Sequence, residues 1–273
     1  MPPQKIKLIQ QGAEAKIFLD ENKNQIIKDR ISKSYRIKEL DDKIRTRRTR
    51  SEYKLLEKAS QIINVPIPTI TNNFKEKDKI IMPFINGKKL SQHLEEFPPE
   101  KQKQILKQIG KDVAKLHDAD IIHGDLTTSN MILVDDCEFS KQTNKHLQEK
   151  EVISLNSNQK ASKKIKRGDI NYSKEKEVIS VGDKNYSPMG GRVGIPQDNF
   201  KIYFIDFGLG FFNGKFEDKA VDLHLLKQAL EAKHFLHWQE NYQSFLEGYK
   251  TSKNCEKTLN QLVKVEKRGR YRH

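Results

Sequence analysis

Four polar side chains along this chain are of types that could bind a phosphate group and a divalent cation. Lys28 follows two isoleucines, and Asn130 comes five residues after Asp125. Asp206 opens an Asp-Phe-Gly triplet. An ammonium group attracts phosphate, and carboxylate and amide oxygens are hard ligands of the kind that Mg²⁺ prefers. Each residue alone has an ordinary explanation. Lys28 could be a solvated lysine on a strand, and the triplet could be an ordinary turn after a strand. A phosphate and cation site is therefore indicated by the order in which these residues occur together.

The segment His123–Asn130 is the most specific part of this set. It reads His-Gly-Asp-Leu-Thr-Thr-Ser-Asn and lies between two apolar segments. A buried histidine and two further polar groups in a loop flanked by strands require either partners or a function. Glu52 is a further candidate because it lies within the apolar stripe of a basic helical segment, although an isolated glutamate there is more often a surface residue.

The elements that would position these residues follow from hydrophobic periodicity and turn residues. Alternating residues predict three short strands joined by tight turns, with Lys28 in the third. A stripe of apolar residues three and four apart predicts a helix that faces the core. The predicted strands are 5–10, 16–20, 25–30, 79–85, 131–134 and 201–205, and the predicted helices are 42–60, one from about residue 100, and several within 218–265.

This order of elements resembles the signature set of the protein kinases. The resemblance implies an α+β fold with two lobes, and it implies ATP and Mg²⁺. In such a site Lys28 binds the α- and β-phosphates of ATP and is held by Glu52. Asn130 and Asp206 hold Mg²⁺, and Asp125 is the catalytic residue that orients or deprotonates the attacking hydroxyl or water.

Two further segments are expected to contact ATP. The turn of the first hairpin would cover the phosphates, and the segment between the fourth strand and the next helix would bind adenine as a hinge. Because proline has no N–H, the hinge proline can offer only its carbonyl, and the isoleucine two residues later would supply an N–H. The residues assigned to ATP in these segments are Gln11, Gly12, Ala13, Glu14, Ala15, Pro83 and Ile85.

Several departures distinguish the chain from an ordinary protein kinase. Gly124 stands where arginine is usual, and Thr127 stands where lysine is usual. The glycine-rich loop keeps one glycine, Gly12, and no Ala-Pro-Glu motif follows Gly208. The chain is therefore expected to have a minimal C-lobe without a full activation segment, and so without the usual means of gripping peptides or of switching by phosphorylation.

These departures match a family. The chain resembles the PRPK family, the small atypical kinase subunit of the KEOPS (EKC) complex, which is related to the RIO kinases. The segments that carry the resemblance are 11–15, 27–30, 47–52, 123–130, 206–209, 217–223 and 267–270. The resemblance implies a weak Ser/Thr kinase that works chiefly as an ATPase in a complex that installs threonylcarbamoyl on the adenosine beside the anticodon of tRNA. It also implies that the C-lobe binds the threonylcarbamoyl-transferase subunit, the N-lobe a small helper subunit and the basic C-terminal tail tRNA.

The chain is predicted to divide into lobes, an insert and a tail. The insert is rich in Ser, Asn, Lys and Gln without an apolar period, and such a composition predicts a disordered loop. The remaining residues have the size of one two-lobed domain. The predicted parts are an N-lobe at 1–85, a C-lobe at 86–136 and 200–265, the insert at 137–199 and the basic tail at 266–273.

The net charge of +14 is concentrated in three segments. Lys and Arg outnumber Asp and Glu by 12 to 6 in residues 28–58, by 12 to 8 in 137–199 and by 8 to 2 in 250–273, so the rest of the chain is nearly neutral. Cations on a flexible arm suit phosphate contacts, although such an arm can also serve solubility alone. The cations assigned to tRNA or partners are Lys264, Lys267, Arg268, Arg270 and Arg272.

Composition also argues against several classes of protein. The two cysteines, Cys137 and Cys255, form no Cys-x-x-Cys pair, which argues against a disulfide scaffold or zinc site and favours a reducing compartment. The absence of an apolar run of eighteen residues, and of an apolar stretch behind Met1, argues against a membrane span and a secretory signal. We expect a cytoplasmic protein that also enters the nucleus, the latter from its basic clusters.

Two other hypotheses keep the same fold. Aminoglycoside and choline kinases also use His-Gly-Asp with a following asparagine, but they require a larger C-lobe with an acidic or aromatic pocket, whereas here only 65 residues follow Gly208 and they end basic. The other hypothesis is a pseudokinase that acts as an RNA-binding scaffold. Four residues that occur together argue against a loss of nucleotide chemistry, namely Lys28, Asp125, Asn130 and Asp206.

Overall fold

The computed structural model describes residues 5–69, 78–135 and 200–269. The chain divides into two units, Met1–Val134 with Phe200–His273, and Asp135–Asn199. The predicted insert at 137–199 lies outside the described residues, as do Arg270 and Arg272 of the predicted tail.

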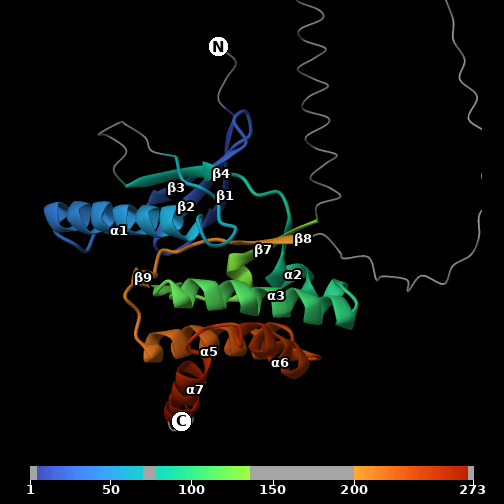
Figure 1. Cartoon of the computed structure of the whole chain (residues 1–273). Coiled ribbons are helices and arrows are strands. Elements are labelled where there is room, and N and C mark those ends of the chain that lie inside the picture. Colours follow the sequence, from blue (N-terminus) through green and yellow to red (C-terminus); the bar gives the residue numbers. More distant parts are fainter. Residues whose placement is uncertain (1–4, 70–77, 136–199, 270–273) are drawn as a thin grey trace, which may run out of the picture. The chain divides into compact units, whose positions relative to one another are not determined.

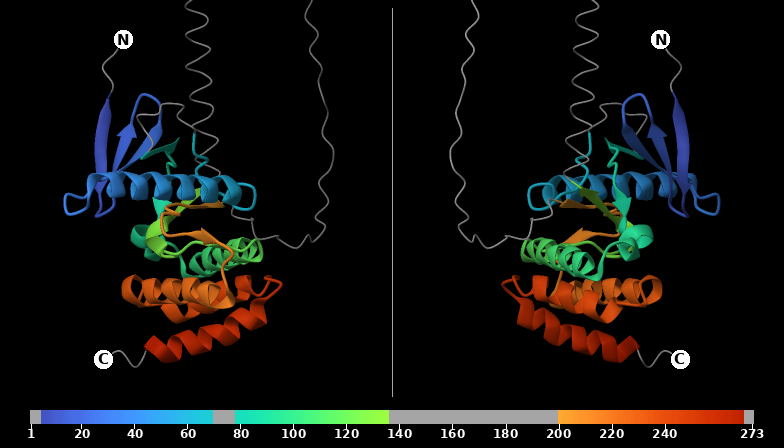
Figure 2. Two further views of the ribbon diagram at one scale, coloured as in Figure 1. Left: turned by 90° about the vertical axis from the view of Figure 1, so that its left-hand side faces the viewer. Right: turned by 90° about the vertical axis from the view of Figure 1, so that its right-hand side faces the viewer.

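An antiparallel sheet and one long helix form the N-lobe (Figure 1). The sheet has four strands in the order β1-β2-β3-β4, as expected for strands joined by short turns. Both side views place α1 between these strands and the helices of the C-lobe (Figure 2). The elements are β1 (Ile6–Gln11), β2 (Ala15–Asp20), β3 (Gln25–Arg30), α1 (Lys38–Ala59) and β4 (Lys79–Pro83).

Strand β1 contains a β-bulge that alternation in the sequence does not reveal. The register with β2 shifts between Leu8 and Gln10, so Ile9 is the extra residue. A bulge reverses the faces on which the following residues lie. As a result, Gln10 lies on the face of the sheet where a regular strand would place Gln11, and Gln11 lies on the opposite face.

The C-lobe consists mainly of helices with two small sheets (Figure 1). Strands β5, β7 and β8 form one sheet, and β6 pairs with β9 in the other. The elements are β5 (Lys88–Lys89), α2 (Leu90–His93), η2 (Leu94–Glu96), α3 (Pro99–Asp118), β6 (Ile121–Ile122), η3 (Thr128–Asn130), β7 (Met131–Asp135), β8 (Phe200–Phe204), β9 (Phe211–Phe212), α5 (Phe216–Lys233), α6 (Trp238–Tyr249) and α7 (Cys255–Gly269).

The core of the C-lobe follows the predicted apolar stripes. Their residues are at most 1% exposed, namely Ile105, Ile109, Val113 and Leu116 of α3 and Leu223, Leu226 and Leu230 of α5. Helices α3 and α6 approach so closely at Gly110 that a Cβ there would lie 2.0 Å from the carbonyl oxygen of Phe245. Only a short passage, 207–215, separates Asp206 from α5. The prediction of a two-lobed α+β fold with a minimal C-lobe is confirmed.

Helix α1 begins earlier than predicted. It starts at Lys38 rather than at residue 42, because its first turn is fixed by polar contacts that apolar periodicity cannot detect. Asp41 is 1% exposed and accepts ion pairs from Arg36 at 3.3 Å and from Arg45 at 2.8 Å. Acidic residues near a helix N-terminus also interact favourably with its dipole.

Helix α7 extends into the predicted tail. It runs through Gly269, so Lys264, Lys267 and Arg268 lie on a helix, and the prediction of a flexible arm is wrong for these three residues. The reason is that Leu262, which is 5% exposed, and the partly buried Val265 continue the helical stripe. Within the described residues, no helix is long and apolar enough to cross a membrane.

Candidate active site

A buried ion pair joins the sheet of the N-lobe to α1. Lys28 Nζ lies 2.6 Å from Glu52 Oε1 and 2.7 Å from Asp206 Oδ1. Lys28 is 7% exposed and Glu52 is 1% exposed. Because β3 pairs with both β2 and β4, the lysine is fixed in the interior of the sheet. The structure therefore brings together three predicted residues from three separate parts of the chain.

Arg30 is a fourth member of this cluster, to which the sequence assigned no role. One guanidinium nitrogen of Arg30 donates to Glu52 Oε2 at 2.6 Å, while Lys28 holds Oε1. Residues two apart on a strand share a face, so Lys28 and Arg30 both reach the same carboxylate. Among the described residues, the Nε of Arg30 is buried without a hydrogen-bond partner. The spacing of two basic residues on a predicted strand was the signal that could have found Arg30.

Lys28 and Asp206 keep each other ionised. Burial alone would lower the pKa of Lys28, but the charges of Glu52 and Asp206 outweigh it and raise that pKa above its ordinary value. Partial burial would raise the pKa of Asp206, but the charge and hydrogen bond of Lys28 lower it below its ordinary value. The cluster thus presents an ammonium group and a carboxylate in their charged forms at neutral pH.

Asp125 and Asn130 form a second pair on the C-lobe side. The Nδ2 of Asn130 donates to the backbone carbonyl of Asp125 and to its Oδ2, each at 2.9 Å. These bonds explain the five-residue spacing, because Asn130 ends the short turn η3 that returns it beside Asp125. Asn130 thereby fixes the Asp125 carboxylate and keeps its own Oδ1 available for a cation.

Asp222 on α5 anchors the loop that carries Asp125. Its carboxylate is 1% exposed and accepts the backbone N–H groups of His123 at 2.8 Å and Gly124 at 2.9 Å. It also lies 3.3 Å from Nε2 of His117. The sequence assigned Asp222 no role, since nothing local connects it to a loop about a hundred residues earlier.

Gly124 explains one departure from ordinary kinases. Its φ is +78°, in the left-handed region where glycine is strongly favoured. A Cβ at this position would lie 2.4 Å from the carbonyl oxygen of Leu209. The arginine that is usual here would therefore collide with the segment that follows Asp206, and the chain uses glycine so that the two backbones can touch.

His123 connects this loop to the Asp-Phe-Gly segment through both nitrogens of its ring. The two hydrogen bonds require a single tautomer. Its Nδ1 accepts the backbone N–H of Asp125 at 3.3 Å, and its Nε2 donates to the carbonyl of Ile205 at 3.2 Å. Its ring centroid lies 4.5 Å from that of Phe207, which is fully buried. Burial is the main reason that the pKa of His123 is lowered from its ordinary value, so the ring is neutral.

Acidification should therefore destabilise the fold through His123. Because its folded-state pKa lies below its unfolded value of about 6.5, the unfolded chain takes up the proton first as the pH falls. The stability that the neutral ring confers is complete above about pH 6.5 and is lost as the pH falls toward the folded-state pKa.

Urea unfolding at pH 7.5 and pH 5.5 measures this effect. We expect the free energy of unfolding to fall by roughly 1 kcal/mol more in the unaltered chain than in His123→Asn. Equal pH dependence in His123→Asn and the unaltered chain would contradict the prediction.

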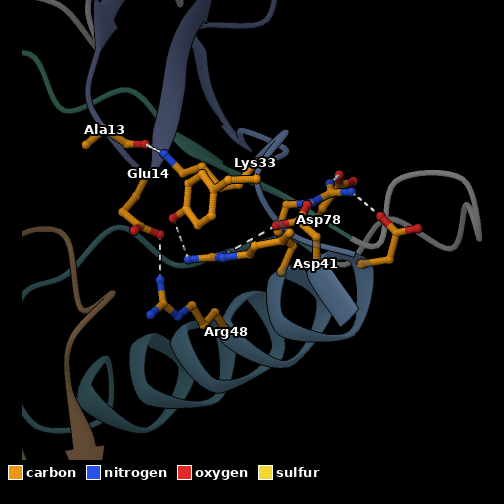
Figure 3. A network of polar contacts seen from close by, with 10 residues as sticks. Ala13, Glu14, Lys33, Asp41, Arg48 and Asp78 are labelled. Atoms are coloured by element: carbon orange, nitrogen blue, oxygen red, sulfur yellow. Dashed lines mark hydrogen bonds and ion pairs between the residues drawn. The ribbon is translucent and has the colours of Figure 1, made fainter. Parts of the chain in front are cut away.

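Two cations hold the turn between β1 and β2, one from α1 and one from the segment between β3 and α1 (Figure 3). Arg48 of α1 pairs with Glu14 at 2.5 Å, and Lys33 donates to the carbonyl of Ala13. The ion pair compensates the negative charge of Glu14, which would otherwise repel a phosphate below the turn. Neither Arg48 nor Lys33 was assigned a role from the sequence.

Two adjoining cavities, each of about 250 Å³, meet at Lys28 and Asp206. The first, which we call the hinge cavity, is lined by apolar residues and by the predicted Glu52, Pro83, Ile85 and Asn130. The second, the loop cavity, is lined by the predicted Gly12, Ala13, Glu14, Ala15 and Asp125, and also by Arg30 and Arg48.

Among the residues predicted to contact ATP, Gln11 lines neither cavity, and its assignment stays a prediction. Gln10 contributes to the walls of both. The bulge at Ile9 is the cause, because it changes the face on which each glutamine lies. At the hinge, the N–H of Phe84 donates to the carbonyl of Asn24 at 3.0 Å and is therefore already used.

The donor set at the junction of the cavities fits Mg²⁺. Oδ1 of Asp206 accepts both Lys28 and the N–H of Gly208 at 3.2 Å, which leaves Oδ2 for a cation beside Asn130. Among the described residues, no cluster of three or more His, Cys, Asp or Glu side chains could hold a metal by itself. This agrees with the preference of Mg²⁺ for one or two protein oxygens together with phosphates and water.

The three tail cations within the described residues, Lys264, Lys267 and Arg268, lie apart from this cluster, on α7. Arg268 forms an ion pair with Glu217 of α5, whereas Lys264 and Lys267 are exposed. Neither cavity includes them. Their assignment to tRNA or a partner stays a prediction.

Sequence comparisons match this architecture to known proteins. The RIO domain (RIO1) family matches residues 13–141. The KEOPS complex subunit Bud32 of Pyrococcus abyssi is 32% identical, and the match covers 98% of this chain and 97% of that protein.

Two further relatives extend the comparison. A probable serine/threonine-protein kinase BUD32 homolog of Archaeoglobus fulgidus is 30% identical over 95% of this chain and 94% of that protein. A probable bifunctional tRNA threonylcarbamoyladenosine biosynthesis protein of Methanobrevibacter smithii is 32% identical over 97% of this chain, which spans only 37% of that protein. With matches that run nearly end to end in two relatives, the chain belongs to the Bud32 family of RIO-domain proteins.

Proposed function

We propose that this chain is the ATP-dependent kinase and ATPase subunit of a KEOPS complex and supports threonylcarbamoyladenosine modification of tRNA. The observation that carries the proposal is the joined cluster of Lys28, Glu52 and Asp206, which faces the Asp125–Asn130 pair across two adjoining cavities. The names of the relatives, a KEOPS subunit and a tRNA threonylcarbamoyladenosine biosynthesis protein, support the biological setting.

ATP would lie across the two cavities. Adenine would occupy the hinge cavity, where Pro83 offers only a carbonyl. The phosphates would lie in the loop cavity under the turn at Gly12–Ala15, within reach of Lys28. Glu52 holds that lysine in place, and Arg30 fixes the free oxygen of Glu52, so the phosphate-binding cation is preorganised.

The reacting groups would lie at the junction of the cavities. Asp206 and Asn130 would hold Mg²⁺, which supplies charge neutralisation of the phosphates. Asp125 is a carboxylate fixed by Asn130 and would orient the attacking oxygen and accept its proton. Asp222 and His123 act only on the position of this loop.

Water is the acceptor that the geometry favours. The passage at 207–215 leads directly into α5, so the chain lacks the length of segment that ordinary kinases use to hold a peptide. The Glu14–Arg48 pair also lines the loop cavity, whose volume is about 250 Å³. A cavity of this size admits water more readily than an extended polypeptide, so we propose ATP hydrolysis as the main reaction.

The proposed partners match surfaces that the described residues leave open. Three apolar residues between Asp206 and the first turn of α5 are 37 to 62% exposed, namely Leu209, Phe211 and Phe216, and they support binding of the transferase subunit to the C-lobe. Strand β1 is an edge of its sheet with exposed Ile6 and Leu8, which supports binding of a helper subunit to the N-lobe. Basic residues of α7 and the segment after it would contact tRNA.

Affinity purification of the tagged chain from extract of its own source cells tests this proposal. We expect the threonylcarbamoyl-transferase subunit to co-purify, and the recovered complex to hydrolyse ATP and modify an unmodified tRNA transcript. Recovery of the chain without that subunit, together with phosphorylation of an aminoglycoside or of choline, would replace the proposal with a small-molecule kinase. The Asp125→Asn chain serves as the control for contaminating ATPases.

A further inference from the structure

The outer face of α1 carries a row of cations that the site does not use. Lys43, Arg47, Arg50 and Lys54 follow one another at steps of four, three and four residues, which places them on one face of the helix. Eleven residues of α-helix extend about 16 Å. At 3.6 residues per turn this face lies opposite Glu52, so α1 has one face in the active site and another that faces away from it.

These four cations are distinguished from their neighbours on α1 by having no carboxylate partner. Arg45 pairs with Asp42 and Asp78, and Arg48 pairs with Glu14. Within the described residues, all four members of the row are exposed and none forms an ion pair. Unpaired like charges three and four residues apart repel one another and destabilise a helix, so the row costs stability unless an anion binds it.

The row borders a groove of about 790 Å³, which we call the α1 groove. Lys43, Arg47, Arg50 and Lys54 line it, and Phe212 of β9, which is 40% exposed, forms part of its wall. The carboxylates of Asp42 and Asp78 also border the groove, but both are bound by Arg45. The groove therefore offers a line of free cations beside an exposed aromatic ring.

We propose that the α1 groove binds a single-stranded segment of RNA, with phosphates along the four cations and a base against Phe212. A row of cations longer than one triphosphate suits a polyanion, and an aromatic side chain beside a basic groove is the combination that binds unpaired nucleotides. A duplex would not present a base to Phe212. The identity of the nucleic acid as RNA rests on the proposed function, whereas the location on α1 does not, and it is separate from the basic residues of α7.

RNA-binding measurements with the full chain test this location. The probes are a fluorescein-labelled uridine 15-mer and an unmodified tRNA transcript, each titrated over a range of salt concentrations. For the variant Lys43→Gln, Arg47→Gln, Arg50→Gln and Lys54→Gln, we expect on the order of a hundredfold weaker binding near 0.1 M salt. The slope of log affinity against log salt should fall by about three, since each single-strand phosphate contact contributes roughly 0.7.

A matched control removes the same charge from another helix. The control variant, Lys103→Gln, Lys107→Gln, Lys111→Gln and Lys115→Gln, changes four lysines of α3, three of which are paired with carboxylates. This control should keep the affinity and slope of the unaltered chain. Both variants should keep the melting temperature within a few degrees and the ATP hydrolysis measured without RNA, because glutamine favours helix and none of these residues lines the cavities.

The aromatic contact has its own control in the adjacent residue. Phe212→Leu should weaken binding of the 15-mer about tenfold without changing the salt slope, since base stacking and not charge is lost. Phe211→Leu changes a ring that is equally exposed but does not line the groove, and should bind normally.

The outcomes separate this proposal from the proposed function. Unchanged affinity in the four-glutamine α1 variant would overturn the α1 groove as an RNA site, even if the unaltered complex modifies tRNA. If the four-glutamine α1 variant bound RNA normally but no longer co-purified with an acidic protein, the RNA site would also be overturned. The groove would then be assigned to that protein. A complex that never modifies tRNA would contradict the proposed function alone, since the 15-mer result does not depend on it.

Discussion

Replacing Asp206 with asparagine should reduce ATP hydrolysis a hundredfold or more while the chain stays folded. The substitution removes the charged oxygen that we assign to Mg²⁺, and the loss of one fixed electrostatic contact to a reacting group typically costs a factor of 100 to 1,000. Asparagine is preferable to alanine here, because the residue has a φ of +63° and asparagine tolerates the left-handed region.

The same result is expected for Asp125→Asn, for a different reason. Asparagine can still accept the bond from Asn130, so the loop should keep its position, but it cannot accept a proton from the attacking oxygen. General-base catalysis is typically worth a factor of 100 to 10,000. Hydrolysis should be measured in the assembled complex by phosphate release, with circular dichroism to confirm folding.

Asp29 provides the matched control for both variants. It lies next to Lys28 on the opposite face of β3 and forms a half-exposed pair with Lys79 at 3.8 Å. Asp29→Asn should hydrolyse ATP at close to the normal rate. Normal hydrolysis in Asp206→Asn or Asp125→Asn would show that these carboxylates do not perform the chemistry assigned to them.

Asp222→Ala should have the largest effect on stability. The change leaves the buried N–H groups of His123 and Gly124 without an acceptor and leaves His117 without its carboxylate. Each buried donor left unsatisfied costs about 1 to 3 kcal/mol, so we expect a loss of roughly 3 kcal/mol or more in the free energy of unfolding. The loop with Asp125 would lose its anchor, so hydrolysis should also fall in the fraction that remains folded.

Urea unfolding of Asp222→Ala and Glu217→Ala makes the comparison on one helix. Glu217 is also an acidic residue of α5, but its side chain is 48% exposed and its partner Arg268 is 64% exposed. Exposed ion pairs contribute about 0 to 1 kcal/mol, so Glu217→Ala should be nearly neutral. If the two variants were equally stable, the loop would be anchored by something other than Asp222.

The sequence is most informative where a single local pattern determines the outcome. Alternation gave the strand that carries Lys28, and the spacing within His123–Asn130 reflects the hydrogen bond between Asn130 and Asp125. What the sequence could not supply are contacts between distant segments. Asp222 meets its loop only after α5 has packed against β6 and η3, which no local period encodes.

Polar and irregular features account for the remaining differences. The first turn of α1 depends on a buried Asp41 with two arginines, which contributes nothing to an apolar stripe. The bulge at Ile9 moved a cavity contact from Gln11 to Gln10, and a regular alternation model contains no such shift. The basic composition at the end of the chain suggested a flexible arm. The apolar residues of α7 also recur with a helical period, and the segment is helical through Gly269.

The close contact between Gly124 and Leu209 has a consequence for inhibitor design. Phe207 is fully buried against His123, and the residues after it are fixed by the pairing of Ile121 and Ile122 with β9. A compound that gains affinity by displacing Phe207 would have to separate β6 from β9. It would also have to break the close contact between the backbones at Gly124 and Leu209. Selective compounds should instead occupy the hinge cavity, where Pro83 has no N–H and offers only its carbonyl.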